Sequence, residues 1–127
     1  MAETVTVDQL ADAITEAVQA YTDDVVEAIE EETERTSEMV LEEVKNLAPK
    51  RTGDYAKSFT KTKRRLSSGV VYNVWNRKHY RRVHLLEFGH AKAGGGRVEG
   101  RPHMAPAIDR HAPGYEQRIK RIIERGG

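Results

Sequence analysis

Residues 7–46 contain neither glycine nor proline, and this uninterrupted stretch limits the possible folds more than any other feature. Apolar residues recur through it at steps of three and four positions, which predicts one amphipathic helix. Asp8 and Asp12 lie in its first turns, where carboxylates suit the positive end of the helix dipole. Pro49 ends the helical segment, placed at 7–48, because the residue before a proline is pushed out of the α region. The apolar series is Val7, Leu10, Ile14, Val18, Tyr21, Val25 and Ile29.

A helix of this length is longer than a small domain can cover. Forty residues at about 1.5 Å each extend about 60 Å, whereas a chain of 127 residues forms a single domain with a modest core. We therefore expect a neighbouring molecule to bury the far end. The apolar pattern lapses over 30–38 and resumes at Met39. A dimeric coiled coil stays an alternative, although the pattern is not a sustained heptad.

Charge is divided unevenly along the chain. Residues 1–49 hold 14 acids and two bases, a net charge of −12, and residues 50–127 hold six acids and 19 bases, a net charge of +13. Three explanations stay open: the acidic helix packs on a basic sheet within one monomer, the halves pair between subunits, or the basic half contacts DNA. The candidate interface positions are Glu30, Glu31, Glu34, Arg77, Arg81, Arg82, Lys92 and Arg97.

The middle of the chain, residues 49–89, predicts a small antiparallel sheet. Thr52 is expected to cap a short helical turn with its hydroxyl. Residues 61–66 and 70–75 are predicted strands on either side of a turn at Ser67-Ser68-Gly69. Residues 83–88 are apolar and fit either a strand or a helical turn closed by Gly89.

The remaining residues predict a loop and a second helix. Residues 90–101 are rich in glycine and are interpreted as a flexible loop that orders against a partner. Residues 102–127 carry a helix from about Met104 to Glu124, in which Pro113 predicts a kink near residues 109–114 or a division into two helices. The whole chain is thus expected to form one α+β domain.

The residue types that support catalysis or metal binding do not form a recognisable site. The chain has no cysteine, which excludes disulfides and thiolate zinc sites. His84, Glu87 and His90 cannot converge on one metal, either on a strand or on a helix. The run 77–82 has the composition of a metal-independent ribonuclease, and the basic half suits nucleic-acid binding, so both are alternatives to a structural role. Otherwise we expect no enzyme, no cofactor and no metal.

No signal peptide and no membrane span are expected. The first ten residues lack a basic start and a hydrophobic run, and no apolar stretch approaches the roughly 20 residues that cross a bilayer. These features are typical of a soluble protein made in a reducing cytoplasm.

Three segments, taken in order, resemble a family of structural phage proteins. Residues 49–59, Pro-Lys-Arg-Thr-Gly-Asp-Tyr-Ala-Lys-Ser-Phe, resemble the Pro-x-x-Thr-Gly-x-Leu-x-x-Ser-Ile/Phe signature of the head–tail joining, or tail-completion, family of long-tailed bacteriophages. Residues 86–90 resemble its Val-Glu-Phe-Gly-Thr, and residues 101–107 resemble its Arg-Pro-Phe-Leu-Arg-Pro-Ala. The departures are Tyr55 for leucine, His90 for threonine, His103 for phenylalanine and Ala105 for arginine. The matched motif positions are Pro49, Thr52, Gly53, Ser58, Glu87, Phe88, Gly89, Pro102 and Pro106.

The resemblance implies a structural virion protein of the phage neck or tail end. It would help to join tail to head as an oligomeric ring, with copies of itself and other neck, connector or tail proteins as partners. Genomic DNA would pass through the ring without sequence-specific binding. In such a subunit Gly53 and Gly89 suit tight turns or positive φ, and Pro106 suits the first turn of a helix. Glu87 is expected to pair with an arginine of the same or a neighbouring subunit.

Overall fold

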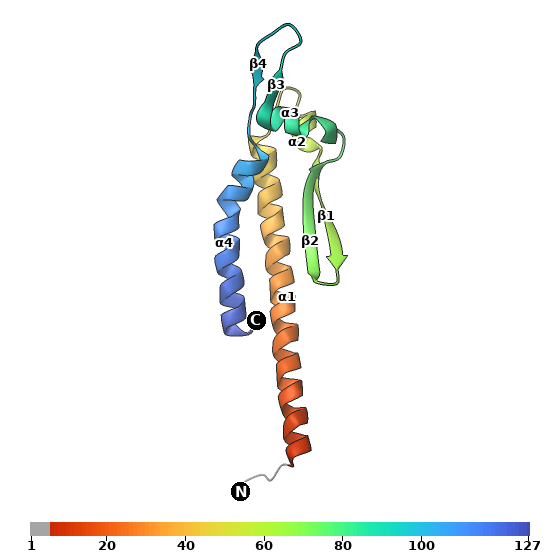
Figure 1. Cartoon of the computed structure of the whole chain (residues 1–127), viewed down its shortest axis with the longest axis vertical. Helices are drawn as coiled ribbons and strands as arrows, with labels where there is room; N and C mark the ends of the chain where they lie inside the picture. Colours follow the sequence, from red (N-terminus) through yellow and green to blue (C-terminus); the bar gives the residue numbers. More distant parts are fainter. Residues whose placement is uncertain (1–5) are drawn as a thin grey trace.

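The computed structural model describes residues 6–127 as an α+β fold built along one long helix (Figure 1). A second helix runs antiparallel along one side of the long helix, and a β-hairpin lies along the other. Short helices and a second hairpin gather at the end where the long helix stops. The elements are α1 (Val7–Leu47), α2 (Asp54–Lys57), β1 (Phe59–Leu66), β2 (Gly69–Asn76), the 3-10 helix η1 (Tyr80–Arg82), α3 (Val83–Phe88), β3 (Gly89–Ala91), β4 (Arg97–Glu99) and α4 (Met104–Arg125).

Both ends of α1 have local causes, which confirm the boundaries expected from the sequence. At the start, the Thr6 side chain accepts from the Gln9 backbone N–H while the Gln9 side chain accepts from the Thr6 N–H, which is a capping box. At the finish, Ala48 has extended geometry with ψ 146°, as a residue before a proline requires. Pro49 therefore ends the helix as predicted.

Helix α4 packs antiparallel on α1, and its contacts fix the register. The Tyr21 hydroxyl donates to the Ile123 carbonyl, the Thr33 and Tyr115 hydroxyls lie 2.7 Å apart, and Arg110 pairs with Glu43. The helix is continuous across Pro113, so of the two predicted alternatives the division into two helices is wrong, and the kink near residues 109–114 stays a prediction. Pro113 is exposed, and packing of the residues on either side against α1 holds the helix together despite the missing N–H.

The sheet region contains two separate two-stranded antiparallel sheets. Strands β1 and β2 pair from Phe59 with Asn76 to Leu66 with Gly69, around a turn at Ser67 and Ser68. The second sheet corrects the interpretation of residues 90–101 as a loop without structure, since β3 pairs with β4 from Gly89–Glu99 to Ala91–Arg97. Backbone pairing on either side of the glycine-rich tip explains the difference; the mobility of this segment stays a prediction. Residues 83–88 form the helical alternative.

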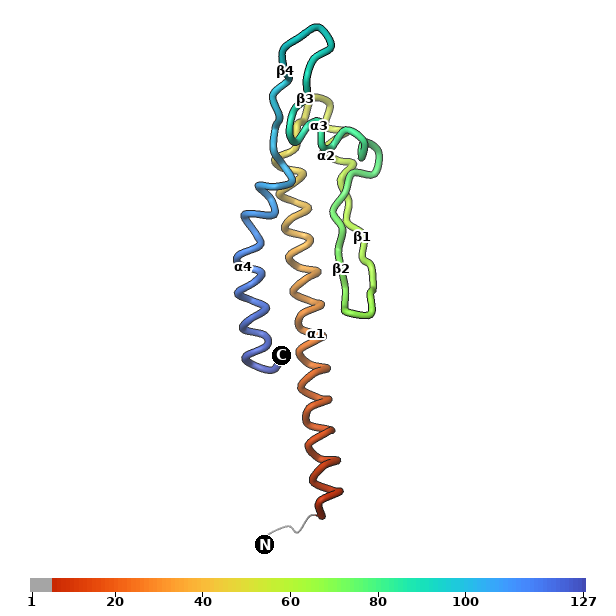
Figure 2. Tube along the Cα trace, viewed as in Figure 1, coloured from red at the N-terminus to blue at the C-terminus, as the bar shows by residue number. Residues whose placement is uncertain are grey.

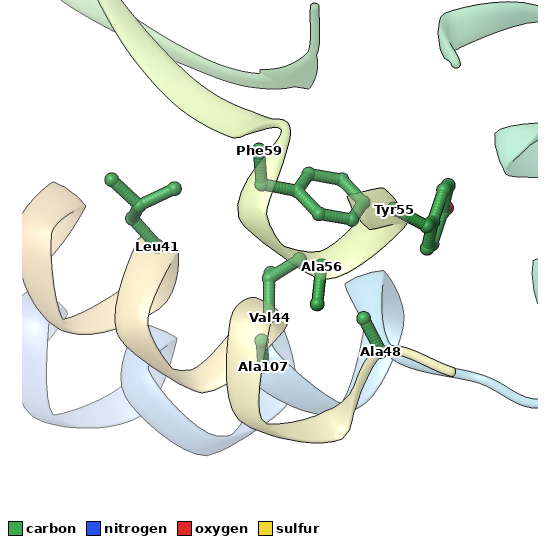
Figure 3. Close-up of a cluster of buried hydrophobic side chains, with 7 residues drawn as sticks. All are labelled: Leu41, Val44, Ala48, Tyr55, Ala56, Phe59 and Ala107. Carbon is green, nitrogen blue, oxygen red and sulfur yellow. The ribbon is translucent and has the colours of Figure 1, made fainter. Parts of the chain in front are cut away.

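The buried core lies only beside the C-terminal half of α1. Figure 3 shows Leu41 and Val44 of α1, with Ala48 directly after it, facing side chains from α2, the start of β1 and α4. The Tyr55 and Phe59 rings meet edge to face with centroids 5.0 Å apart, an arrangement that aromatic pairs favour. The cluster comprises Leu41, Val44, Ala48, Tyr55, Ala56, Phe59 and Ala107.

The N-terminal half of α1 extends beyond both the hairpin and α4 (Figure 2). Every residue from 6 to 24 is exposed, and Val7, at 84%, is the most exposed of the large apolar residues in the described chain. This confirms that the helix outreaches the elements that cover it. The apolar residues from Val7 to Val18 are left without intramolecular packing, and Tyr21 contacts the end of α4.

Candidate functional site

Glu87, at the end of α3, binds the beginning of α4. Its carboxylate accepts from the backbone N–H groups of His103 and Met104 at 2.9 Å, and from that of Ala105 at 3.0 Å. The side chain is only 4% exposed. An anion at this place is stabilised by the unpaired N–H groups and by the positive end of the helix dipole.

The Glu87 carboxylate and Pro106 together leave no backbone N–H without a hydrogen-bond acceptor at the start of α4. The first four N–H groups of a helix have no intrahelical partner. Here they belong to positions 103–106: Glu87 binds the first three, and Pro106 has no N–H to satisfy. His103, the residue before the helix, makes no side-chain cap of its own. Glu87 supplies the cap from 16 residues earlier in the chain.

The expected pairing of Glu87 with an arginine is therefore wrong within the described chain. The helix N-terminus takes the place of the guanidinium. Burial acts to raise the pKa of Glu87, but the three backbone N–H groups and the nearby His103 ring outweigh it, so the pKa lies below its usual range. The carboxylate is charged at neutral pH, and its charge is satisfied inside the fold.

His103 connects this cap to the core. Its ring is fully buried, and Nδ1 lies 2.7 Å from the Arg101 carbonyl. Because a carbonyl only accepts, Nδ1 carries a proton, and this nitrogen also lies 3.1 Å from the Glu87 carboxylate. Nε2 lies 2.7 Å from the Tyr55 hydroxyl. Burial, and then the Glu87 charge, raise the pKa of Tyr55 to about 12, so its phenol stays protonated.

The three motifs of the sequence thus meet at one place, which we call the motif junction: Tyr55, Glu87 and His103. Other motif residues shape the backbone around it. Gly53 and Gly89 have φ values of +81° and +80°, as expected. A Cβ on Gly89 would lie 2.3 Å from the Val98 carbonyl oxygen, so only glycine fits there.

The residues of the first motif support this junction from the side of α2. The Thr52 hydroxyl accepts from the Asp54 N–H at 3.3 Å, which matches its predicted capping role, although Gly53 occupies the cap position itself. The Ser58 hydroxyl donates to the Asp54 carbonyl at 2.6 Å. Asp54 also binds His79 and Lys78, and these hydrogen bonds lower its pKa.

Phe88 differs from the rest of its motif because its side chain faces solvent. It is 69% exposed, directly after the buried Glu87. Leu85 and Tyr80 are exposed in the same short helical region. The Phe88 ring is solvent-exposed next to the buried Glu87, so it is available for contact with another molecule.

The candidate interface residues occupy three separate places. Glu30, Glu31 and Glu34 lie midway along α1, and Glu30 pairs with Arg65 of β1 at 3.0 Å. The bases of residues 77–82 lie in a turn and in η1. Lys92 and Arg97 lie on the second hairpin, where Arg97 donates to the Phe88 carbonyl at 2.6 Å. These positions do not form one site.

Within residues 6–127, the acids of α1 form ion pairs with the basic half of the chain only along the C-terminal half of the helix. Ion pairs from β1 and α4 reach that half of the helix. Asp8, Asp12, Glu16 and Glu27 have no ion pair among residues 6–127, and the same is true of Asp23 and Asp24. Of the three explanations for the divided charge, packing within one monomer therefore applies to half of the helix. The inter-helix and helix–hairpin pairs are Lys61–Glu38, Arg65–Glu30, Arg110–Glu43 and Arg118–Glu32.

Sequence reasoning missed the roles of Tyr55 and His103, which entered only as departures from a motif. One signal for the cap was present. Helix α4 has no Ser, Thr, Asp or Asn before its first turn, so its cap must come from elsewhere. Glu87 is the only acid between Asp54 and Glu99.

The described residues hold no arrangement for metal chemistry and no membrane span. Within 6–127, no three His, Cys, Asp or Glu side chains are placed to hold a metal ion. None of the helices in this part of the chain combines the length and apolar character that crossing a bilayer requires.

Comparison with known proteins gives one match. A family model described as "Bacteriophage HK97-gp10, putative tail-component" matches residues 12–89, which include most of α1, the first motif and all but the last residue of the second. No curated protein and no solved structure matches the chain.

Proposed function

Because the chain belongs to the HK97-gp10-like family of phage tail components, we propose that it is a ring-forming subunit at the neck of the virion. The family is structural and not enzymatic, which overturns the ribonuclease alternative. The ring would complete the end of the tail and help join it to the head, with DNA passing through its centre. Its partners would be copies of itself and other neck, connector or tail proteins.

One observation carries the proposal of self-assembly: residues 7–20 of α1 form a helix with no intramolecular cover. A capping box and a run of helix-forming residues hold residues 7–24 helical, yet their apolar stripe is exposed. A stripe of this kind normally faces a core. Assembly would supply that core from outside the monomer.

The motif junction holds α2, α3 and the start of α4 together through buried hydrogen bonds. This supports a structural role in which each subunit keeps the same conformation. Glu87 ties α3 to α4, and Tyr55 ties α2 to the same point. The exposed Phe88 and the second hairpin project from this fixed base. Contacts with other virion proteins would fall here, at the end of the molecule opposite the uncovered helix.

Removal of the gene from its phage tests the proposed function. We expect filled heads and separate tails, seen by electron microscopy, and recovery of joined particles when the protein is supplied in trans. Normal joined particles without the protein would refute the role.

Ionic strength tests the contribution of charge to assembly. Exposed ion pairs are worth roughly 0–1 kcal/mol each and are screened by salt, so several together should make self-association weaker at high salt. Glu31→Lys/Glu34→Lys is the suitable reversal, because Glu30 already pairs with Arg65 in the monomer. Sedimentation at low and high salt measures the effect. If neither high salt nor the charge reversal weakened the oligomer, apolar contacts would hold it together.

A further inference from the structure

We infer that the uncovered half of α1 docks into a groove between α1, β2 and α4 of a second copy of the chain. The inference rests on the proposed self-assembly and names the two surfaces that meet. The donor surface, called the α1 stripe, consists of Val7, Leu10, Ile14 and Val18, all exposed, and of Tyr21, which is 46% exposed and donates to the Ile123 carbonyl of the same chain. The receiving surface, called the α1–β2–α4 groove, consists of two adjoining hollows of about 420 and 230 Å³.

The groove is lined mainly by apolar side chains that the monomer leaves open. The two hollows share Val70 and Val71 of β2, with Tyr115 of α4 opposite them. Val71 is 39% exposed, and Ile108, at one end, is 50% exposed. Partly exposed valine and isoleucine in a concave surface gain free energy when another apolar surface covers them.

The two surfaces have matching lengths. Along α1 the groove extends from Val26 to Val40, which is about 21 Å at about 1.5 Å per residue. The stripe from Val7 to Tyr21 has the same number of residues and therefore the same length. The midpoint of the stripe, Ile14, then lies opposite the shared middle of the groove at Val71, whichever way the helix runs.

Charge favours this pairing over contact between two stripes. Residues 7–27 carry six acids and no base, so two such segments side by side would repel each other. The β1–β2 hairpin that forms one wall of the groove carries Lys61, Lys63, Arg64 and Arg65 and no acid. Among residues 6–127, Lys63 and Arg64 have no ion-pair partner and are exposed. The acidic helix is therefore attracted to the hairpin wall of the groove, whereas the α1 wall of the groove contributes Glu30, which already pairs with Arg65.

The spacing of the stripe is compatible with a coiled coil as well as with a groove. The steps from Val7 through Leu10, Ile14, Val18 and Tyr21 are three, four, four and three residues, a mean of 3.5. A coiled coil keeps the same 3.5-residue period. The repulsion between two acidic stripes, and not the spacing, therefore favours the groove over a second stripe. Because stripe and groove are different surfaces, the contact is head to tail and generates a ring or a filament.

Complementation between two variants tests this assignment. Ile14→Asp/Val18→Asp disables the stripe and leaves the groove intact, whereas Ile108→Asp disables the groove and leaves the stripe intact. Each variant alone should sediment as a monomer at low salt, and an equal mixture should form a dimer, because one good stripe meets one good groove. All three residues are exposed, so circular dichroism should show unchanged helix content and thermal midpoint.

Cross-linking provides a second measurement that does not rely on the aspartate variants. The chain has no cysteine, so Ile14→Cys mixed with Val71→Cys should give a mixed disulfide dimer on mild oxidation. His84→Cys, exposed on α3, is the control partner and should give only background. If the Ile14→Cys homodimer were the main product, the α1 stripe would contact the stripe of another copy, and the inference would be overturned.

Three further outcomes would also overturn it: a monomeric mixture of the aspartate variants, cross-linking no greater than with His84→Cys, and a wild-type chain that stays monomeric at every concentration. Failure of this interface is distinguishable from failure of the proposed function. Phage particles that need the protein to join head and tail would retain the function, even if the subunits met through another surface.

Discussion

Both ends of α1 carry apolar residues at steps of three and four positions, on either side of the lapse at 30–38, yet only the C-terminal end is part of the folded core. Leu41 and Val44 are buried against α2, β1 and α4, whereas Ile14 and Val18 face solvent. Acidic residues differ in the same way: Glu32 and Glu43 pair with arginines of α4, and Asp8 and Asp12 pair with nothing in the described chain. An amphipathic pattern therefore predicts that the apolar face of a helix will be buried. It does not show whether the same chain or another molecule buries it.

The comparison is tested most directly by truncating one apolar residue in each half. Leu41→Ala should lower the free energy of unfolding by about 2–5 kcal/mol, because it leaves a cavity in a packed core. Ile14→Ala should change it by less than about 0.5 kcal/mol in the monomer, as is usual for exposed positions. Urea unfolding at a concentration where the chain is monomeric measures both. A comparable loss at Ile14 would mean that the stripe is covered within the chain.

The motif junction should be the most sensitive polar site in the covered half. Glu87→Ala removes the acceptor for three buried N–H groups and should cost roughly 2–4 kcal/mol of unfolding free energy. Glu99→Ala is the matched control, since Glu99 is exposed on the neighbouring hairpin and has no ion pair within residues 6–127. Equal effects of the two substitutions would show that Glu87 contributes nothing as a cap.

Two departures from the family motifs, Tyr55 and His103, should depend on each other. Tyr55→Phe leaves the buried Nε2 of His103 without a hydrogen-bond partner and should cost about 1–2 kcal/mol. Tyr55→Leu/His103→Phe introduces the family's residues at both positions and removes both polar groups together. The double variant should lose less stability than the sum of Tyr55→Leu and His103→Phe. Simple additivity in a double-mutant cycle would refute the coupling.

Acid should weaken the covered half before it affects the helicity of the free half. The pKa of Glu87 is lower in the folded chain than its usual value of 4.5. Its contribution to stability is therefore complete above that value and is lost as the pH falls through the lower, folded pKa. Glu87→Gln should be less stable at neutral pH and should show a smaller decrease below pH 4.5. Parallel pH profiles for wild type and Glu87→Gln would contradict the depressed pKa.

Much of the fold was predictable because its causes are local. Steps of three and four apolar residues, with no glycine or proline, give the long helix, and the pair Ala48-Pro49 ends it. The run 70–75, rich in valine and aromatic residues, predicted β2, although both strands are longer than expected. The predictions were incomplete where contacts between residues far apart in the chain determine the structure. Pairing across a glycine-rich tip makes a hairpin of residues 90–101, and packing on α1 keeps α4 continuous past Pro113.

The candidate site was predictable as three motifs but not as one place. The motifs identified Glu87, Gly89 and Pro106, and the resemblance to phage neck proteins agrees with the matching family. The partner of Glu87 was predicted wrongly, because an arginine and a helix N-terminus attract a carboxylate alike and only the fold shows which is near. Tyr55 and His103 are 48 positions apart, and their contact follows from the packing of α2 against the start of α4.

By itself, the sequence determined the length and acidity of α1, the strand pair and the positions where glycine and proline control the backbone. These depend on interactions between residues close in the chain. The tertiary structure alone decided that Glu87 caps α4, that the basic half neutralises only half of the acidic helix, and that the other half stays uncovered. Those outcomes depend on distances between residues far apart in the chain, which no local spacing can set.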